Sequence, residues 1–301
     1  MKNLVFLIIA GALLGGCASK PYESNPKYSF ALNVMKATGS TEIKDSESEE
    51  DATKIRDGGP TVVGTVGYGI IGALSNPGSG LGIGSVMDGL LHGGAGLAVA
   101  NPKAPENSPH LYAWMPTEMA ATQDEAHARL GDILLEALKK ALADTELPAG
   151  YVADSPRLDN PRYPKHIASS IVGEGCSPSG PAFCGYVIYS LKKGFKAGLV
   201  TPPDFIGTEP SPHWALFDAY GVGGASFVLD KTPAARFPDL EVYQKLSANL
   251  PEWVFIYLAP QKIWPGQRAM TSIRTTNGFV PLGKSVILNK GQVHLFVKPN
   301  S

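Results

Sequence analysis

The chain has 301 residues, an apolar fraction of 44% and a formal net charge of −1. This length suits one large or two small domains, and the apolar fraction is ordinary for a globular core. Because no cluster of Lys and Arg forms a basic stripe, we do not expect nucleic acid as a partner.

The N-terminal segment, residues 1–16, is organised like a bacterial lipoprotein signal peptide. Lys2 precedes an apolar run from Leu4 to Leu14, which has the length of a signal-peptide core and is too short to span a membrane. The run ends at Leu14-Gly15-Gly16-Cys17, which resembles the lipobox of bacterial lipoproteins. Two alternatives stay open, namely an ordinary cleaved signal peptide with an accidental cysteine and a true transmembrane anchor.

The lipobox resemblance implies an anchor and a location. It implies cleavage before Cys17, diacylglycerol on its thiol and an acyl chain on its new amino group. Two or three such chains hold a protein durably on a bilayer. By resemblance to enterobacterial lipoproteins, the lack of Asp after Cys17 implies export to the outer membrane, either leaflet face being open.

Residues 17–60 are expected to carry the anchor and link it to the rest of the chain. Residues 18–27 are polar and contain two prolines, which is typical of a tether. Residues 28–35 (YSFALNVM) are interpreted as a first strand. Residues 36–60 include an acidic cluster and predict a solvated loop.

Residues 61–108 form a glycine-rich apolar segment outside the expected core. No charged residue occurs between Thr61 and Met87. Small residues at regular spacing let helix backbones approach closely inside a membrane. The segment therefore predicts an apolar hairpin that enters the bilayer or packs against copies of itself, with a soluble loop as the alternative. The spaced glycines that carry this prediction are Gly64, Gly72, Gly80 and Gly84.

Residues 109–301 predict an α+β domain. The clearest helix covers 122–143, where Thr122 and Glu125 have the spacing of a capping box. A second helix is predicted from Asp239 to Leu250. Strands are predicted at 110–115, 151–153, 183–191, 253–259, 269–275, 285–288 and 292–298, with short ones at 214–220 and 225–229, whereas 154–180 is expected to be a loop.

These elements predict one mixed or antiparallel sheet with two main helices on one face. The order of lipobox, strand, glycine-rich hairpin and strand–helix–strand unit resembles that of the TraT-type surface-exclusion lipoproteins. No residue-level motif carries this likeness, and the present chain is longer at its C-terminal end. We therefore transfer no functional residue from that family.

Cys176 and Cys184 are predicted to form a disulfide. They enclose a short loop rich in Ser, Pro and Gly, and the periplasm is an oxidising compartment. A redox or metal-binding pair is the alternative, but redox pairs more often have two intervening residues and no His lies within this loop.

No catalytic or metal-binding motif stands out. The sequence lacks a GxSxG elbow, and Ser226 near His213 and Asp218 has only a chance resemblance to a triad. No HxH or HExxH occurs, and His127 is expected to make a surface contact with Asp124. The sequence predicts no cofactor and no metal. Three loop carboxylates that can converge in space are Glu174, Asp204 and Glu209.

Two functional hypotheses follow. The first is an outer-membrane lipoprotein with a structural, envelope-assembly or partner-docking role, oligomeric through its glycine-rich segment. The second is a lipid-tethered periplasmic hydrolase or small-ligand-binding protein. The expected partners are the membrane, through the N-terminal lipid, and either a second copy of the chain or another envelope protein.

Overall fold

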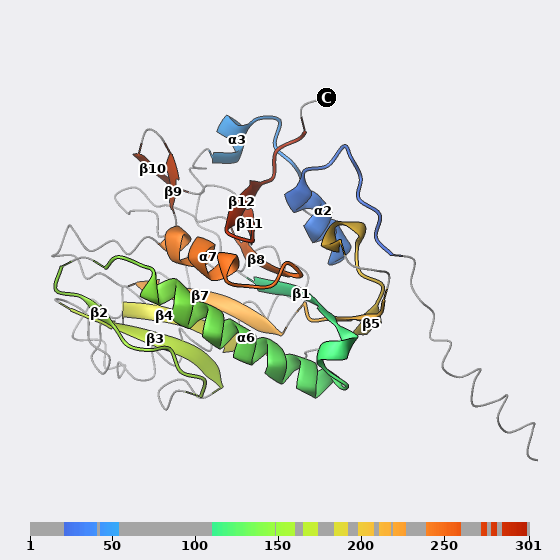
Figure 1. Ribbon diagram of the computed structural model, residues 1–301. Coiled ribbons are helices and arrows are strands. Elements are labelled where there is room, and N and C mark those ends of the chain that lie inside the picture. The colour runs from blue at the N-terminus through green and yellow to red at the C-terminus, as the bar shows by residue number, and fades with distance from the viewer. Residues whose placement is uncertain are drawn as a thin grey trace, which may run out of the picture.

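The computed structural model describes residues 21–40, 43–53, 110–147, 149–159, 165–173, 184–191, 198–207, 211–217, 219–226, 239–259, 272–275, 278–281 and 285–299. These residues form an α+β fold, with helices packed on an open antiparallel sheet (Figure 1). The predicted fold class is confirmed.

The sheet is ten-stranded, and its neighbouring strands all run antiparallel. From one edge to the other, the main path is β12 (Gln292–Leu295), β11 (Val286–Asn289), β8 (Val254–Leu258), β1 (His110–Pro116), β7 (Tyr220–Ser226), β4 (Cys184–Ser190), β3 (His166–Val172) and β2 (Val152–Ala153). Off this path, β6 (His213–Ala215) joins β1 to β5 (Gly198–Val200). A separate hairpin consists of β9 (Ser272–Thr275) and β10 (Gly278–Pro281).

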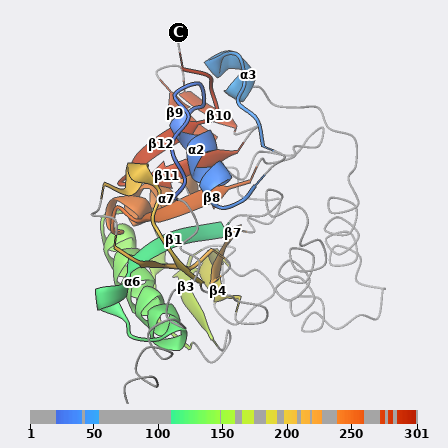
Figure 2. The ribbon, with the colours of Figure 1, turned by 90° about the vertical axis from the view of Figure 1, so that its right-hand side faces the viewer.

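Two helices, α6 (Gln123–Ala143) and α7 (Asp239–Ala248), pack together on one face of the sheet, as predicted (Figure 2). Helix α6 begins where the capping box places it, because Thr122 Oγ1 accepts a hydrogen bond from the Glu125 amide at 3.2 Å. Helix α7 contacts the sheet through Tyr243, whose ring lies edge-on to Tyr186 of β4.

The segment predicted as a first strand is instead a helix, α2 (Phe30–Ala37). A short continuous apolar run does not distinguish strand from helix by periodicity. The N-cap favours the helix. Ser29 Oγ accepts a hydrogen bond from the Leu32 amide at 3.0 Å, and the Asp45 carboxylate accepts hydrogen bonds from the Ser29 amide and hydroxyl. Helix α2 covers the face of the sheet opposite α6, where Phe30 contacts Phe255.

The described part of the acidic segment, residues 43–53, is not the solvated loop that was predicted. Ser46 pairs with Val297 in a β-bridge next to β12, and a short helix, α3 (Glu49–Thr53), follows. Ser48 starts this helix, since its Oγ accepts from the Asp51 amide at 3.1 Å. Lys298 forms an ion pair with Glu47 beside the bridge. Asp45 and Glu47 of this segment are therefore used in hydrogen bonds and an ion pair.

The sequence did not predict β3, β5 and β10, and it misplaced β7. Strand β3 lies in the segment expected to be a loop, where four prolines outweighed the alternating Ile167, Ser169 and Ile171, all buried. Strand β7 runs through Gly221, Gly223 and Gly224, which lie between the two short strands predicted at 214–220 and 225–229. Gly221 belongs there because the ring of Tyr189 on β4 occupies the space above it.

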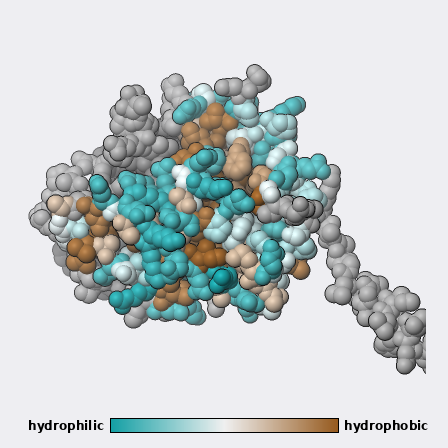
Figure 3. Space-filling view, viewed as in Figure 1, coloured by the Kyte–Doolittle hydropathy of each residue, from teal (hydrophilic) through white to brown (hydrophobic). Residues whose placement is uncertain are grey.

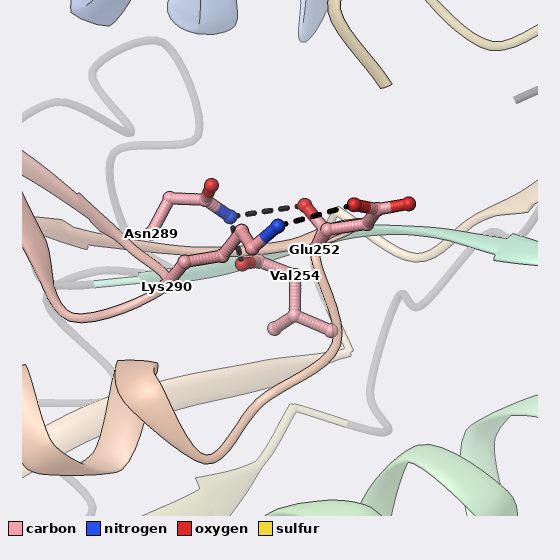
Figure 4. Close-up of polar contacts among 4 residues, drawn as sticks. All are labelled: Glu252, Val254, Asn289 and Lys290. Carbon is pink, nitrogen blue, oxygen red and sulfur yellow. Dashed lines mark hydrogen bonds and ion pairs between the residues drawn. The ribbon is translucent and has the colours of Figure 1, made fainter. Parts of the chain in front are cut away.

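The C-terminal hairpin of β11 and β12 matches its prediction, and polar contacts fasten its turn. Lys290 and Gly291 both have positive φ, as a tight two-residue turn of this hand requires. Asn289 Nδ2 donates to the carbonyls of Glu252 (2.9 Å) and Val254 (3.0 Å), while Lys290 Nζ lies 3.4 Å from the Glu252 carboxylate (Figure 4). The turn is thus held against the start of β8.

Candidate functional site

The described part of the chain begins at Pro21 and is attached to the body from Tyr22 onward. Tyr22 donates its hydroxyl to Asn33 Oδ1 at 2.9 Å, and the Ser24 amide and hydroxyl donate to the two Asp204 carboxylate oxygens at 3.0 and 2.5 Å. The Asp204 amide donates to the Tyr22 carbonyl at 3.4 Å. We call Tyr22, Ser24, Asn33 and Asp204 the N-terminal clamp. Tyr22 and Ser24, within the expected tether, are therefore held against the body.

The clamp is built on a rigid support. Asp204 opens a 3-10 turn, η3 (Asp204–Ile206), which follows the extended Pro203 and ends at Gly207 with a φ of 68°. Ile206 is buried, and the Phe205 ring lies edge-on to Trp114 and Phe255, at 5.9 Å from each. The carboxylate that holds Ser24 is therefore fixed to the central strands.

The electrostatics of Asp204 suit this binding role. Partial burial acts to raise the pKa of the Asp204 carboxyl, but hydrogen bonds from the Ser24 hydroxyl and from backbone amides outweigh it and hold the pKa below its usual range. Burial raises the pKa of Tyr22, as do nearby Tyr28 and Asp204. Asp204 is thus an ionised acceptor. The other two loop carboxylates singled out in the sequence, Glu174 and Glu209, lie outside the described residues.

A second polar cluster joins α6 to the sheet. His127 is buried, so the expected surface contact is wrong; its Nε2 lies 3.1 Å from Ser190 Oγ and 3.3 Å from the Ala219 carbonyl. The Tyr220 ring stacks on the imidazole, with centroids 4.8 Å apart, and its hydroxyl donates to the His127 carbonyl at 3.1 Å. Gly131, one helical turn on, leaves room for the Tyr220 hydroxyl.

The roles in the contact between Ser190 and His127 depend on the tautomer of the imidazole. A carbonyl oxygen only accepts hydrogen bonds, so with a proton on Nε2 the ring donates toward the Ala219 carbonyl, whereas an unprotonated Nε2 accepts from the Ser190 hydroxyl. The cluster therefore positions α6 against β4 and β7, and burial of Tyr220 raises the pKa of its hydroxyl, which keeps it a donor.

The structure separates the serine and histidine that sequence proximity had paired. His213 pairs with Pro116 at one end of β1, while β7 pairs with the other end of β1 and runs on to Ser226. The strand rise places these two residues roughly 35 Å apart along the sheet. His213 is fully buried, with Nδ1 2.7 Å from the Ser211 carbonyl, and Asp218 lies outside the described residues.

The remaining predicted site residues are not tested by the structure. Cys184 is the first residue of β4, where it pairs with Ile171 and Ser226, but its side chain is not described. The lipidation, disulfide and membrane-segment predictions stay predictions. The residues that lie outside the described part of the chain are Cys17, Gly64, Gly72, Gly80, Gly84 and Cys176.

The β2 end of the sheet carries exposed apolar side chains. Val152 is 67% exposed, and its partner across the strand pair, Val172, is 39% exposed. Figure 3 shows apolar surface at this end of the body. Among the described residues β2 is the last strand, with its outer edge not paired to another strand.

No family model, no curated protein and no solved structure matches this chain. Within the described ranges, no helix is both long enough and apolar enough to cross a bilayer. Nor do three or more His, Cys, Asp or Glu residues of that part of the chain gather into a metal-binding group.

Proposed function

We propose that the protein is an outer-membrane lipoprotein, anchored through Cys17, whose α+β body has a structural or envelope-assembly role. The observation that carries this proposal is the lipobox, followed only five residues later by the first contact of the N-terminal clamp, Tyr22. A body fastened so close to a lipidated residue stays at the membrane surface. That arrangement suits a protein that acts by being held at the membrane and binding other envelope components there.

The β2 end of the sheet supports the partner-docking part of the proposal. A sheet edge presents backbone groups that a strand of another protein can pair with, and neighbouring apolar side chains add affinity. Val152 and Val172 supply such side chains. The glycine-rich segment, with Gly64, Gly72, Gly80 and Gly84, is proposed as a second contact region, for the membrane or for sister subunits.

The proposal is tested at its anchor. Cys17→Ser in the full chain should leave uncleaved precursor or an untethered product, because serine is not acylated at this position. Membrane fractionation and intact-mass spectrometry measure both outcomes. Ser19→Ala is the matched control, since it leaves the lipobox whole and should fractionate like wild type. A wild-type mature N-terminus without acyl mass would contradict the proposal.

A further inference from the structure

We propose that the end of the body formed by the N-terminal clamp and β5 is its membrane-facing surface, with Leu199 at the lipid headgroups of the bilayer that holds the anchor. This inference rests on the proposed function, because it takes Cys17 to be the lipidated residue. It adds an orientation that the sequence did not predict.

The length of chain between anchor and clamp limits where the body can lie. Five Cα–Cα steps separate Cys17 from Tyr22, and five steps span at most about 18 Å even when fully extended. Helix α6 alone has 21 residues, which makes it about 31 Å long. A tether this much shorter than the body cannot let the body turn over and present its opposite end to the membrane.

The clamp couples the anchor to the core. Ser24 is held by Asp204 through both its amide and its hydroxyl, and Phe205 fixes Asp204 to Trp114 on the central strand. The point at which the chain leaves the body is therefore rigid. A rigid exit point and a short tether together define which surface faces the bilayer.

Strand β5 lies at this same end and presents an apolar side chain. It precedes Asp204 by only a few residues, and Leu199 is 59% exposed. Figure 1 draws β5 on the side where the described chain begins and β2 on the opposite side. An exposed leucine next to a lipid anchor gains apolar burial when it enters the interfacial region of a bilayer.

The test compares two exposed strand positions at opposite ends of the body. Leu199→Cys and Val152→Cys are made in the full acylated chain, labelled with a thiol-reactive fluorophore and inserted into phosphatidylethanolamine–phosphatidylglycerol vesicles containing a headgroup-spin-labelled lipid. Wild type, labelled in parallel, corrects for Cys176 and Cys184. We expect at least threefold stronger quenching at 199 than at 152.

Equal quenching, or stronger quenching at 152, would overturn the inferred orientation while the lipoprotein proposal stands, provided that the mass of the same preparation shows acylated Cys17. Unacylated Cys17 would overturn both. A second arm adds Ser24→Ala with Asp204→Asn, which frees part of the clamp and should reduce the difference between the two labels. Glu136→Gln, an exposed residue of α6 paired with Lys139, is the matched control and should leave the difference unchanged.

Discussion

The two halves of the sheet are packed by different means. In the half formed by β1, β8, β11 and β12, large apolar side chains fill both faces, and Phe255, Ile256 and Tyr257 are all buried. In the half formed by β7, β4 and β3, apolar side chains such as Ile167, Ile171 and Ile188 are buried too, but one aromatic ring lies over a strand glycine. The ring of Tyr189 stands where a side chain at Gly221 would be, 2.3 Å from the position of a Cβ.

The two halves therefore contribute to the same core through different features of their side chains. The first half depends on the volume of contiguous apolar residues, so it tolerates swaps that conserve volume. The second half depends in addition on the absence of a side chain at Gly221. A substitution at Gly221 is expected to lower stability through the atoms that it adds. A substitution in the first half is expected to lower stability through the atoms that it removes.

The largest effect is expected in the first half, at Phe255. Its ring centroid lies 5.5 Å from that of Trp114, 5.9 Å from that of Phe205 and 6.2 Å from that of Phe30. Phe255 therefore joins η3 and α2 to the sheet. Phe255→Ala should lower the free energy of unfolding by about 3–5 kcal/mol. Urea denaturation measures it. Phe255→Leu, which retains most of the volume, should cost less than about 1.5 kcal/mol, and equal losses for the two variants would argue against the comparison.

A smaller effect is expected in the second half, at Gly221. Gly221→Ala should lower the free energy of unfolding by about 1–3 kcal/mol, because the new methyl group overlaps the Tyr189 ring. In a Tyr189→Ala background the same substitution should cost less, which a double-mutant cycle measures. Gly198→Ala is the control: nothing lies within 4 Å of its Cβ position, so its effect should stay within about 0.5 kcal/mol.

The smallest effect is a pH dependence confined to the first half. Burial lowers the pKa of His294, whose ring lies 4.5 Å from Phe30. The folded state thus favours the neutral imidazole, and the unfolded state binds more protons once the pH falls below about 6.5. Stability should therefore be lost as the pH falls from 7.5 to 5.0. In His294→Gln this loss should be smaller, and an identical pH profile by urea denaturation would contradict the assignment.

Local signals predicted several elements in both halves of the sheet. The capping box at Thr122, the apolar run of β8 and the turn at Lys290 each decide their element within a few residues. Helix α2 was missed because its cap is supported by Asp45, 16 residues from Ser29. Strand β7 was misplaced because the reason for a glycine at position 221 is the ring of Tyr189, which lies on a neighbouring strand.

Sequence patterns could not predict the N-terminal clamp either, because it too depends on contacts between residues far apart in the sequence. Ser24 and Asp204 are 180 residues apart, and neither lies in a recognisable motif. The contact between His127 and Ser190 spans 63 residues. Such pairings follow from the topology of the sheet, which no local periodicity encodes. Asp204 was selected as a loop carboxylate, but its role in holding the N-terminal segment required the fold.

The position of β1 bears on how the chain reaches its native state. This strand is central, yet its neighbours on either side, β7 and β8, begin only at Tyr220 and Val254. Such non-local pairing gives a high contact order and slow folding. While the chain is being made from its N-terminus, the middle of the sheet stays incomplete until Leu258 has emerged. In a protein exported as proposed, that delay keeps the polypeptide threadable through a secretion channel until nearly all of it has been synthesised.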